Sequence, residues 1–353
     1  MILKSLTLTS FKNHQNAQFS FGDRINCLLG RNGVGKTNLL DAIYYLSFSK
    51  SAFSIQDRNA IMHEHSFFAI HGKYNDLTVA IQAASGKSKT IKVNGREPDK
   101  LSDLIGLVPL VLVLPDDTQM IREGSEERRK FFDGAVSQFE KPYLQDLLHY
   151  GKLLKQRNSL LKNAEDRGMN LSLLDTYDQQ LIPLAKKISQ RRAELAEVFV
   201  PFLEKNYQDM HQGNEQPALE FSTEVDEGFA EKFKASLQRD RIMRRTMMGS
   251  HRDDFNFLLN GVPIKKYGSQ GQQKTFILSI KLALYDFLKE KTGKTPLLLL
   301  DDIFDKLDDN RIQLLISLLA DEVRFGQIFI TDARSERSRA LLSDLGNVEI
   351  FEI

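Results

Sequence analysis

The pattern of apolar and polar residues changes twice along the chain. Residues 2–8 alternate between apolar and polar side chains, which predicts a strand. A short apolar run at 26–29 predicts a second, buried strand, and apolar residues at helical spacing predict a helix over 38–46. A glycine-rich loop separates the second strand from the helix. This order of elements is typical of the start of an α/β domain.

Three further alternating segments follow, at 67–74, 77–84 and 89–93. Residues that favour tight turns separate or end these segments, and they are Asn75-Asp76, Gly86 and Asn94-Gly95. Short alternating segments joined by such turns are typical of β-hairpins. We therefore predict an antiparallel β layer in the N-terminal part of the fold.

From about residue 116 to residue 245 the pattern becomes helical. Apolar residues recur at three- and four-residue spacing, as at Leu181, Leu184, Ile188, Leu195 and Val198. Helix-breaking residues are expected to divide this block into segments of roughly 20 to 30 residues. These residues are Pro142, Gly168, Pro183 and Pro201. The block predicts an arm of several helices rather than one long coiled coil.

The α/β pattern returns after the helical block. Residues 255–259 resemble a strand that ends at an Asn260-Gly261 turn. The pattern then predicts a helix over 272–290 and two apolar strands, at 297–300 and 327–331. The helical block is therefore interpreted as an insertion that divides one α/β fold.

These changes divide the 353 residues into two parts. We predict that residues 1–115 and 246–353 form one α/β domain and that residues 116–245 form an inserted helical subdomain. The chain length agrees with two parts, because a domain has about 150 residues.

Composition limits the classes of function. Lysine and arginine number 48 against 47 aspartate and glutamate, so a basic surface can only be local. Hydrophobic residues make up 41% and charged residues 27%, as in proteins that form a packed core. The single cysteine, Cys27, excludes an intrachain disulfide and favours a reducing compartment. No apolar run approaches the roughly 20 residues of a membrane span, and the N-terminus lacks a secretory pattern. We expect a cytoplasmic protein.

The loop after the second predicted strand carries the strongest chemical signal. Residues 30–37 match the phosphate-loop pattern in full, and a predicted helix follows directly. Glycines allow the backbone amides to surround a phosphate, and the helix N-terminus adds a partial positive charge. Lys36 is expected to reach the β- and γ-phosphates of ATP, and the Thr37 hydroxyl is expected to bind Mg²⁺. The candidate ATP-binding residues here are Gly30, Arg31, Asn32, Gly33, Val34, Gly35, Lys36, Thr37 and Asn38.

Two acidic residues follow the predicted strand at 297–300. The carboxyl ends of parallel strands form the ligand-binding edge of open α/β sheets. Asp301 is therefore a candidate Mg²⁺ ligand, and Asp302 is a candidate for orienting or deprotonating the attacking water. Lys36 and Asp302 are the candidate catalytic residues. An apolar run that ends in acids is also common in ordinary strands, so the assignment depends on the phosphate loop.

A third segment precedes the predicted helix over 272–290. Ser269 lies in a glycine-containing turn before this helix, 32 residues before Asp301, which makes a second helix start able to receive an anion. The simpler alternative is a serine that only caps the helix. The candidate ATP-binding residues in this segment are Ser269, Gln270, Gly271 and Gln272.

These three segments, in this order, resemble an ABC-type ATPase. In that family an LSGGQ-like signature completes the ATP site of a second subunit, and residues 306–309 resemble the D-loop. Further segments resemble the RecF family of bacterial recombination and replication-repair proteins. They are Phe11 to His14, Gly35 to Tyr44, Glu126 to Asp133 and His251 to Asp254. The resemblance covers essentially the whole chain, and it implies an ABC-type ATPase head with a mixed sheet, an antiparallel β layer and an inserted helical arm.

The resemblance also implies a function. Members of this family bind DNA around single-strand gaps and duplex junctions as an ATP-stabilised dimer, and they work with RecR and RecO to load the recombinase RecA. The implied cofactors are ATP and Mg²⁺, and the implied enzyme is a weak Mg²⁺-dependent ATPase. Asp302 stands where most ABC ATPases have glutamate, and the shorter side chain implies slow turnover.

The chain departs from the family pattern at several positions. Arg31 stands where an acidic residue is common, and Lys12 where arginine is usual. Thr331-Asp332 stands where many ABC proteins have a switch histidine, and Gln119 is only a candidate for the Q-loop. The turn at Ser269 is a loose version of the signature.

Local clusters of basic residues are candidates for DNA contacts, although such clusters more often form ordinary solvated surfaces. They are Arg239, Arg241, Arg244 and Arg245; Lys186, Lys187, Arg191 and Arg192; and Lys87, Lys89, Lys92 and Arg96. His251 lacks a partner at a metal-ligand spacing, which favours a structural role. The alternatives to a RecF-like protein are the nucleotide-binding subunit of a transporter, which is usually shorter, and an SMC-like head, whose coiled coil is far longer than this arm.

Overall fold

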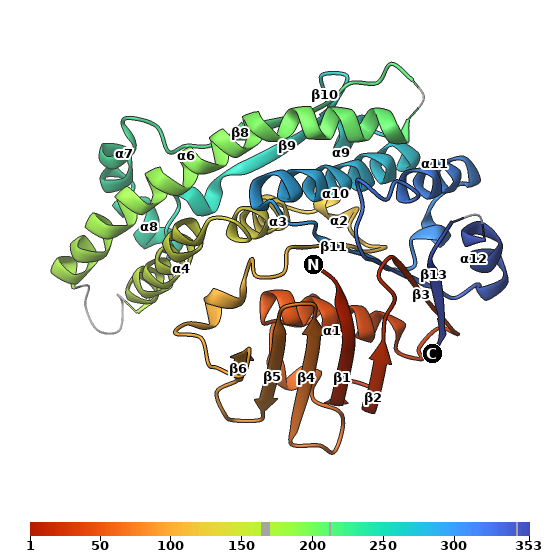
Figure 1. The fold of residues 1–353 in the computed structure, drawn as a ribbon. Helices are drawn as coiled ribbons and strands as arrows, with labels where there is room; N and C mark the ends of the chain where they lie inside the picture. Colours follow the sequence, from red (N-terminus) through yellow and green to blue (C-terminus); the bar gives the residue numbers. More distant parts are fainter. Residues whose placement is uncertain (164–169, 212, 344) are drawn as a thin grey trace. The chain divides into compact units, whose positions relative to one another are not determined.

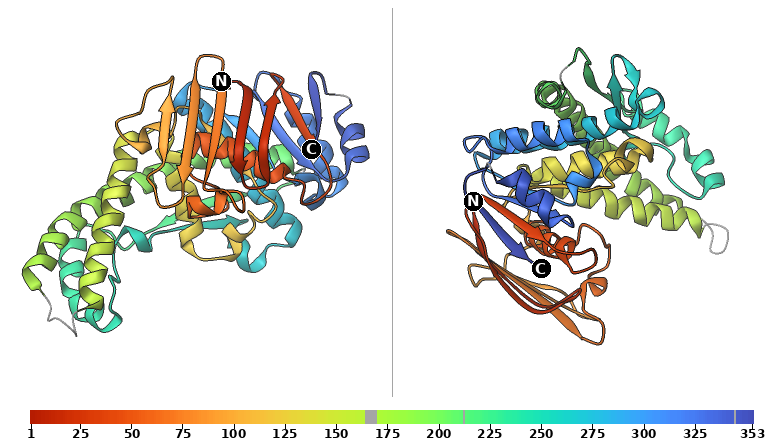
Figure 2. Two further views of the ribbon diagram at one scale, coloured as in Figure 1. Left: turned by 90° about the horizontal axis from the view of Figure 1, so that it is seen from below. Right: turned by 90° about the vertical axis from the view of Figure 1, so that its right-hand side faces the viewer.

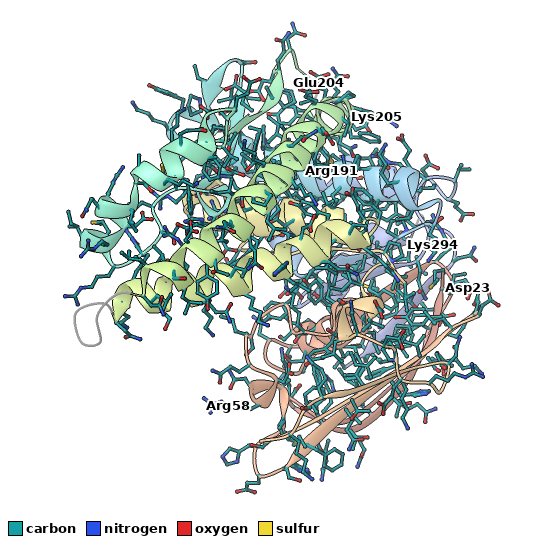
Figure 3. All side chains as sticks on the ribbon, turned by 90° about the vertical axis from the view of Figure 1, so that its left-hand side faces the viewer. Asp23, Arg58, Arg191, Glu204, Lys205 and Lys294 are labelled. Atoms are coloured by element: carbon teal, nitrogen blue, oxygen red, sulfur yellow. The ribbon has the colours of Figure 1, made fainter. Side chains whose placement is uncertain are left out.

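The computed structural model describes residues 1–163, 170–211, 213–343 and 345–353. The chain forms two compact units (Figure 1). Unit 1 contains Met1–Thr118, Lys205–Asn214 and Gln270–Ile353, and unit 2 contains Gln119–Glu204 and Glu215–Ser269. Figure 3 labels Glu204 and Lys205, the neighbouring residues of one helix at which unit 2 gives way to unit 1.

A five-stranded parallel sheet forms the centre of unit 1. Its strand order is β13-β3-β12-β11-β7, and every neighbouring pair is parallel. All residues of β3, β7, β11 and β12 are buried, which explains their mainly apolar sequences. The strands are β3 (Ile25–Leu29), β7 (Leu110–Val113), β11 (Leu297–Leu300), β12 (Ile328–Asp332) and β13 (Val348–Glu352).

Four longer helices accompany this sheet in unit 1. They are α1 (Lys36–Phe48), α10 (Gln270–Thr292), α11 (Asp309–Leu319) and α12 (Ser335–Leu342). Helix α10 packs against β7, and 14 of its residues are buried. The predicted strand–loop–helix start, the helix over 272–290 and the parallel strand at 297–300 are thereby confirmed.

The second sheet of unit 1 is antiparallel, as predicted from the alternating segments. Its order is β2-β1-β4-β5-β6, and Figure 2 (left) shows these strands side by side. Helix α1 contacts strands of both sheets, so it lies between them. Leu6, Leu8, Ile70 and Ile81 are among the residues buried in this layer. The strands are β1 (Leu3–Phe11), β2 (His14–Ser20), β4 (Phe67–Tyr74), β5 (Thr78–Ala84) and β6 (Thr90–Val93).

Unit 2 is mainly helical. Its helices are α2 (Gln119–Arg122), α3 (Ser125–Ser137), α4 (Lys141–Lys162), α6 (Leu171–Met210, whose last residues belong to unit 1), α7 (Phe229–Ala235), α8 (Leu237–Met243) and α9 (Ile264–Tyr267). A three-stranded antiparallel sheet of order β10-β9-β8 belongs to the same unit. Its strands are β8 (Pro217–Ser222), β9 (Asp254–Leu259) and β10 (Val262–Pro263). Short 3₁₀ segments complete the chain: η1 (Asp57–Ala60), η2 (Leu101–Leu104), η3 (Ser250–Arg252) and η4 (Ile303–Lys306).

Two of the expected helix boundaries are wrong. Pro183 and Pro201 lie inside the 40-residue helix α6, although proline in a helix interior costs about 3 kcal/mol. Leu181, Leu195 and Phe199 are fully or almost fully buried on this helix, and their packing offsets the lost backbone hydrogen bonds. Pro142 lies in the first turn of α4, as a helix start requires, and Gly168 lies outside the described residues.

The units also differ from the expected domain boundaries. Strand β8 interrupts the block that was expected to be entirely helical, and it pairs along its whole length with β9. Residues 246–269 therefore fold with unit 2 rather than with the α/β domain, and residues 205–214 belong to unit 1. The reason is the long-range pairing of two strands, which local periodicity does not reveal.

Buried ion pairs hold the helices of unit 2 together. Arg157 is fully buried and pairs with Asp178 and Asp240. The guanidinium group of Arg192 bonds both Asp133 and Asp253. Removing one partner of such a buried pair lowers the free energy of unfolding by about 3 to 5 kcal/mol. These residues are therefore part of the structural framework. Within the described part of the chain, no helix combines the length and apolar character of a membrane span.

Candidate nucleotide-binding site

The loop between β3 and α1 has a backbone that only glycine permits at its last position. Gly35 caps α1 with φ 115°. A Cβ atom there would lie 2.5 Å from Asn13 Nδ2 and 2.9 Å from His14 Nε2. A side chain at Gly35 would therefore collide with the turn between β1 and β2. The glycine allows that turn to press directly against the loop.

Asn13 and His14 support the loop from this turn. Asn13 Nδ2 donates a hydrogen bond to the carbonyl oxygen of Val34 at 2.8 Å. Asn13 Oδ1 accepts a hydrogen bond from Asn38 Nδ2, also at 2.8 Å. His14 Nε2 faces the carbonyl oxygen of Gly35 at 3.1 Å, so this nitrogen donates. Burial lowers the pKa of His14 and favours its neutral form. The motif Phe11 to His14 marks this segment in the sequence, and its contacts in the fold give it the role of supporting the loop.

Lys12, in the same turn, anchors the helix that follows the loop. Its Nζ atom lies 2.7 Å from Oδ2 of Asp41, which is fully buried in α1. Asp41 also accepts hydrogen bonds from Ser51 Oγ and the Ala52 amide, each at 2.7 Å. The lysine at this position therefore fixes α1 relative to the turn.

Lys36 folds back over the loop. Its side chain is almost completely buried, and Nζ donates hydrogen bonds to the carbonyl oxygens of Gly30 at 2.8 Å and Arg31 at 3.1 Å. The loop thus holds a positive charge among its own carbonyl groups, while Arg31, Asn32 and Gly33 are exposed. A phosphate group in the loop would offer this ammonium group a stronger, charged acceptor than the carbonyl oxygens.

Thr37 and Asp301 meet at the carboxyl edge of the parallel sheet. Thr37 Oγ1 lies 2.9 Å from Oδ1 and 3.0 Å from Oδ2 of Asp301, which follows β11. Thr331 Oγ1, on β12, donates to Asp301 Oδ1 at 2.7 Å. Burial raises the pKa of Asp301 above its usual range. A cation would stabilise this buried carboxylate in its ionised form.

The residues at this edge fit Mg²⁺. A hydroxyl and a carboxylate are hard oxygen ligands, and Mg²⁺ commonly combines one or two such ligands with phosphate oxygens. Among the described residues, no group of three or more histidine, cysteine, aspartate or glutamate side chains could hold a metal on its own. A metal held by Thr37 and Asp301 would need further ligands, and the phosphate oxygens of a nucleotide could supply them.

Asp302 has an unusual backbone conformation. Its φ of 42° lies in the left-handed region, which costs a residue other than glycine about 1 to 2 kcal/mol. The amide of Asp302 donates a hydrogen bond to Thr331 Oγ1 at 2.9 Å, and the residue is partly exposed. Asp301 and Asp302 thus contact the same threonine hydroxyl from consecutive positions.

The start of α10 lies at the surface. Ser269 and Gln270 are exposed, and Gly271 and Gln272 are partly buried. A Cβ atom at Gly271 would lie 3.1 Å from Nη2 of Arg311. Arg311 Nε donates a hydrogen bond to Thr275 Oγ1 at 2.6 Å, and its guanidinium group pairs with Asp308.

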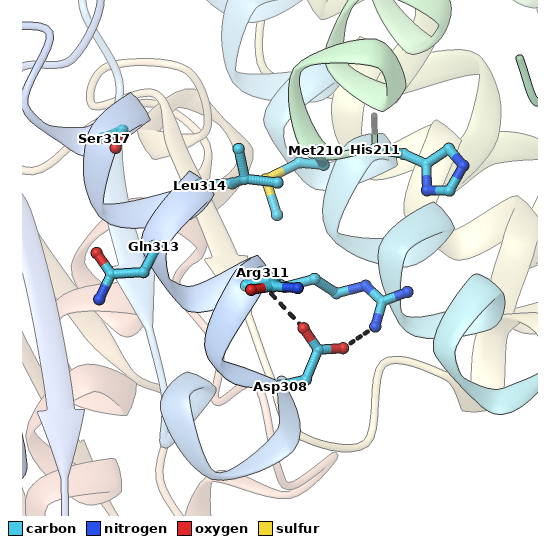
Figure 4. Close-up of a pocket in the computed structure, with 8 residues that line it drawn as sticks. Met210, His211, Asp308, Arg311, Gln313, Leu314 and Ser317 are labelled. Carbon is cyan, nitrogen blue, oxygen red and sulfur yellow. Dashed lines mark hydrogen bonds and ion pairs between the residues drawn. The ribbon is translucent and has the colours of Figure 1, made fainter. Parts of the chain in front are cut away.

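Arg311 therefore ties the beginning of α10 to the segment that resembles the D-loop. Figure 4 shows Arg311 and Asp308 with the ion pair between them, at the wall of a pocket of about 540 Å³. Met210, His211 and Leu314 also line this pocket. A side chain at Gly271 would crowd this guanidinium group, so the glycine suits the close approach of Arg311 to the first turn of α10.

The basic clusters differ from their expected exposure. Arg192 is buried in its ion pairs, and Arg191 pairs with Glu140, so the cluster on α6 is only partly available. Lys89 pairs with Asp57. Arg239, Arg241, Arg244 and Arg245 are exposed, on α8 and just after it. This last cluster is the most accessible of the three.

His251 and Cys27 have the structural environments expected of them. His251 Nδ1 lies 2.8 Å from Tyr150 Oη, and Nε2 lies 3.1 Å from the carbonyl oxygen of Thr246. Cys27 is buried in β3, and burial raises its pKa to about 12. Gln119 is the first residue of α2, and its Q-loop role stays a prediction. Asp332, at the position of the family's histidine, is buried and accepts a hydrogen bond from Ser338 Oγ.

Residues 2–348 match the family model described as RecF/RecN/SMC N terminal domain. The DNA replication and repair protein RecF of Flavobacterium johnsoniae is 40% identical over 348 residues, which cover 97% of each chain. The RecF protein of Bacteroides thetaiotaomicron is 41% identical over 363 residues, covering 100% of this chain and 97% of that one. This chain belongs to the RecF family.

A RecF structure supports the same assignment. The solved structure of the recombination mediator protein RecF-ATPrS in the RecFOR pathway superimposes with a TM-score of 0.88 at 31% sequence identity. The match covers 99% of this chain and 95% of that one. Membership of the RecF family confirms the resemblance and the predicted ABC-type, SMC-like ATPase fold with its P-loop. It favours the RecF interpretation over a transporter subunit.

Proposed function

We propose that this chain is an ATP-dependent DNA-binding protein of recombinational repair and replication restart. Its relatives in Flavobacterium and Bacteroides are DNA replication and repair proteins. In the proposed mechanism two copies close around DNA when ATP is bound and separate after hydrolysis. The main support for this mechanism is that Ser269 and Gln270 are exposed at the start of α10. A residue that binds the nucleotide of a partner copy must be accessible.

ATP acts in this mechanism as the link between two copies. The phosphate loop of one copy binds the triphosphate, and the helix start at Ser269 of the other copy approaches its γ-phosphate. ATP can shift the monomer–dimer equilibrium only if it contacts the dimer more favourably than the monomer. A nucleotide held between two chains meets that condition, because the second set of contacts exists only in the dimer.

The rate of ATP hydrolysis determines how long the two copies stay together. Lys36 binds the β- and γ-phosphates, and Asp302 orients the attacking water. Thr37 and Asp301 would hold Mg²⁺, which would supply positive charge to the phosphate oxygens during phosphoryl transfer. The carboxylate of Asp302 is one methylene shorter than the glutamate of most ABC ATPases, so we expect weak, slow ATPase activity.

The proposed substrate is DNA at single-strand gaps and their duplex junctions, with RecR and RecO as partners in loading RecA. This part of the proposal comes from membership of the RecF family. The exposed arginines of α8 offer a local positive surface in unit 2. Contacts to the phosphate backbone recognise the form of DNA rather than its base sequence. The proposed location of the protein is the cytoplasm.

Sedimentation velocity with ATP, Mg²⁺ and a gapped duplex tests the proposal. We expect the unchanged chain to form a DNA-bound dimer with ATP and to remain a monomer without it. Ser269→Arg should bind ATP yet fail to dimerise. Ser172→Arg is a matched control, because Ser172 is an exposed serine in the first turn of α6, and it should dimerise normally. A chain that stays monomeric at saturating ATP with DNA would overturn the proposal.

A further inference from the structure

Thr331 makes the shortest side-chain link between the two acidic residues of the site. It lies near the end of β12, beside β11, and is fully buried. Its hydroxyl oxygen lies 2.7 Å from Asp301 Oδ1 and 2.9 Å from the amide nitrogen of Asp302. One hydroxyl therefore contacts both the candidate metal ligand and the backbone of the candidate catalytic residue.

The chemistry of the two partners fixes the orientation of this hydroxyl. The Asp301 carboxylate only accepts hydrogen bonds when it is ionised, and the Asp302 amide only donates. The Thr331 hydroxyl must therefore donate to Asp301 and accept from Asp302. Both of its hydrogen-bonding roles are used, and no rotation of the hydroxyl satisfies both partners in another way.

The contact lies where the backbone is strained. Asp302 has φ 42°, a conformation that L-residues with a side chain rarely adopt and keep only when their surroundings hold them there. The hydrogen bond from its amide to Thr331 supplies such a constraint at the strained residue itself. The direction of the Asp302 side chain depends on this backbone conformation, since φ sets the course of the Cα–Cβ bond relative to the preceding strand.

We propose that Thr331 is a positioning residue for ATP hydrolysis, which sets the Asp302 carboxylate relative to Asp301 through its hydroxyl. This inference rests on the proposed function, because it assigns Asp302 to the attacking water. The chain has no histidine at the following position, where Asp332 is buried and bonded to Ser338. A threonine hydroxyl thus links the end of β12 to the backbone of the candidate catalytic residue.

Two substitutions separate the hydroxyl from the packing of the side chain. Thr331→Val keeps the shape and β-branching of threonine but removes the donor and acceptor. Thr331→Ser keeps the hydroxyl and removes a methyl group. A purely structural role in packing would make serine the more harmful change, whereas positioning through the hydroxyl makes valine the more harmful one.

The first measurement is single-turnover hydrolysis of ATP with Mg²⁺, together with ATP affinity, in the full chain. We expect Thr331→Val to lower the hydrolysis rate about tenfold or more while ATP affinity stays within about threefold. The variant keeps the phosphate loop and the Asp301 carboxylate, and it loses only the hydroxyl contacts to Asp301 and Asp302. Thr331→Ser should hydrolyse ATP within about threefold of the unchanged chain. Equal rates for valine and the unchanged chain, or equally slow rates for valine and serine, would overturn the inference.

The second measurement needs neither ATP nor Mg²⁺. Hydrogen–deuterium exchange of the segment that contains the Asp302 amide should be faster in Thr331→Val than in the unchanged chain and unaltered in Thr331→Ser. Unaltered exchange in Thr331→Val would overturn the inference. If the unchanged chain fails to hydrolyse ATP, the hydrolytic part of the proposed function is wrong, and this exchange experiment alone decides whether Thr331 holds Asp302.

Discussion

The hydroxyl of Thr37 lies 2.9 Å from a carboxylate oxygen of Asp301, although 264 residues separate the two in the sequence. Thr37 belongs to the first turn of α1, and Asp301 follows β11. Strands β3, β12 and β11 are consecutive in the parallel sheet, so the ends of β3 and β11 reach the same edge. The fold thus brings a magnesium-type ligand pair together from opposite ends of the chain.

Replacing Asp301 by asparagine is expected to remove most of the effect of Mg²⁺ on ATP binding. The amide is a weaker ligand for a hard cation than the carboxylate it replaces. We expect ATP affinity with Mg²⁺ to fall about tenfold or more, which corresponds to about 1.4 kcal/mol per factor of ten. ATP affinity in EDTA serves as the control and should change little. Equal losses with and without Mg²⁺, measured by calorimetry, would contradict the assignment.

Gly35→Ala is expected to damage both stability and ATP binding. The left-handed backbone costs alanine about 1 to 2 kcal/mol, and the new methyl group would also collide with Asn13 and His14. Gly86→Ala is the matched control, because Gly86 also has positive φ but has open space around it. Urea denaturation should show a larger loss for Gly35→Ala, and only this variant should lose ATP affinity. Similar behaviour of the two variants would mean that the turn at Asn13 does not support the loop.

The pH dependence of stability should contain a contribution from His251. Burial lowers its pKa to about 4, whereas the unfolded chain has a value near 6.5. Between these values the unfolded state binds more protons, so the free energy of unfolding should rise with pH over that window and fall on acidification. The full contribution is about 3 kcal/mol.

Chemical denaturation at pH 5 and pH 7 checks this prediction. His251→Gln removes the titrating ring, so the loss of stability at pH 5 should be smaller than in the unchanged chain. His149→Gln is the control, since His149 is exposed in the same unit, and it should keep the original pH dependence. The same pH dependence in His251→Gln and the unchanged chain would contradict the neutral, buried state of His251.

Arg311→Lys is expected to weaken ATP-dependent dimerisation without weakening ATP binding by the monomer. The planar guanidinium group of Arg311 contacts both Thr275 and Asp308, and the single ammonium group of lysine cannot reproduce this geometry. The dimer dissociation constant, measured by sedimentation with ATP, should rise about tenfold. Gln313→Ala, an exposed change on the same helix, should leave it unaltered. An unchanged dissociation constant for Arg311→Lys would show that this contact does not shape the dimer surface.

Much of unit 1 could be predicted because its signals are local. The alternation at 67–74 and the apolar run at 297–300 matched β4 and β11 to the residue, and the phosphate-loop pattern placed α1. Strand β8 could not be predicted in the same way, because its stability comes from pairing with β9, which starts more than 30 residues later. The helix ends predicted at Pro183 and Pro201 were wrong, because packing along α6 outweighs the low helix propensity of proline.

The residues of the candidate site differ in the same way, since some could be predicted from the sequence and others could not. Lys36, Thr37 and Asp301 follow from motif and spacing, since the residue types themselves carry the chemistry. The contact of Thr331 with Asp301 does not, because a neutral side chain in a buried strand has no distinctive pattern. The motif Phe11 to His14 marks the turn that holds Asn13 and His14, but only the fold shows that this turn supports the phosphate loop.

Mixing two inactive variants tests the shared nucleotide site most directly. Lys36→Arg damages the phosphate loop and Ser269→Arg damages the helix start, so each variant alone should hydrolyse little ATP. In a mixed dimer, the intact loop of one copy meets the intact serine of the other. An equimolar mixture should then hydrolyse ATP faster than either variant alone, up to about half of the activity of the unchanged chain, because each mixed dimer has one intact site of two. Activity in the mixture no higher than the mean of the two separate variants would contradict a site built from two chains.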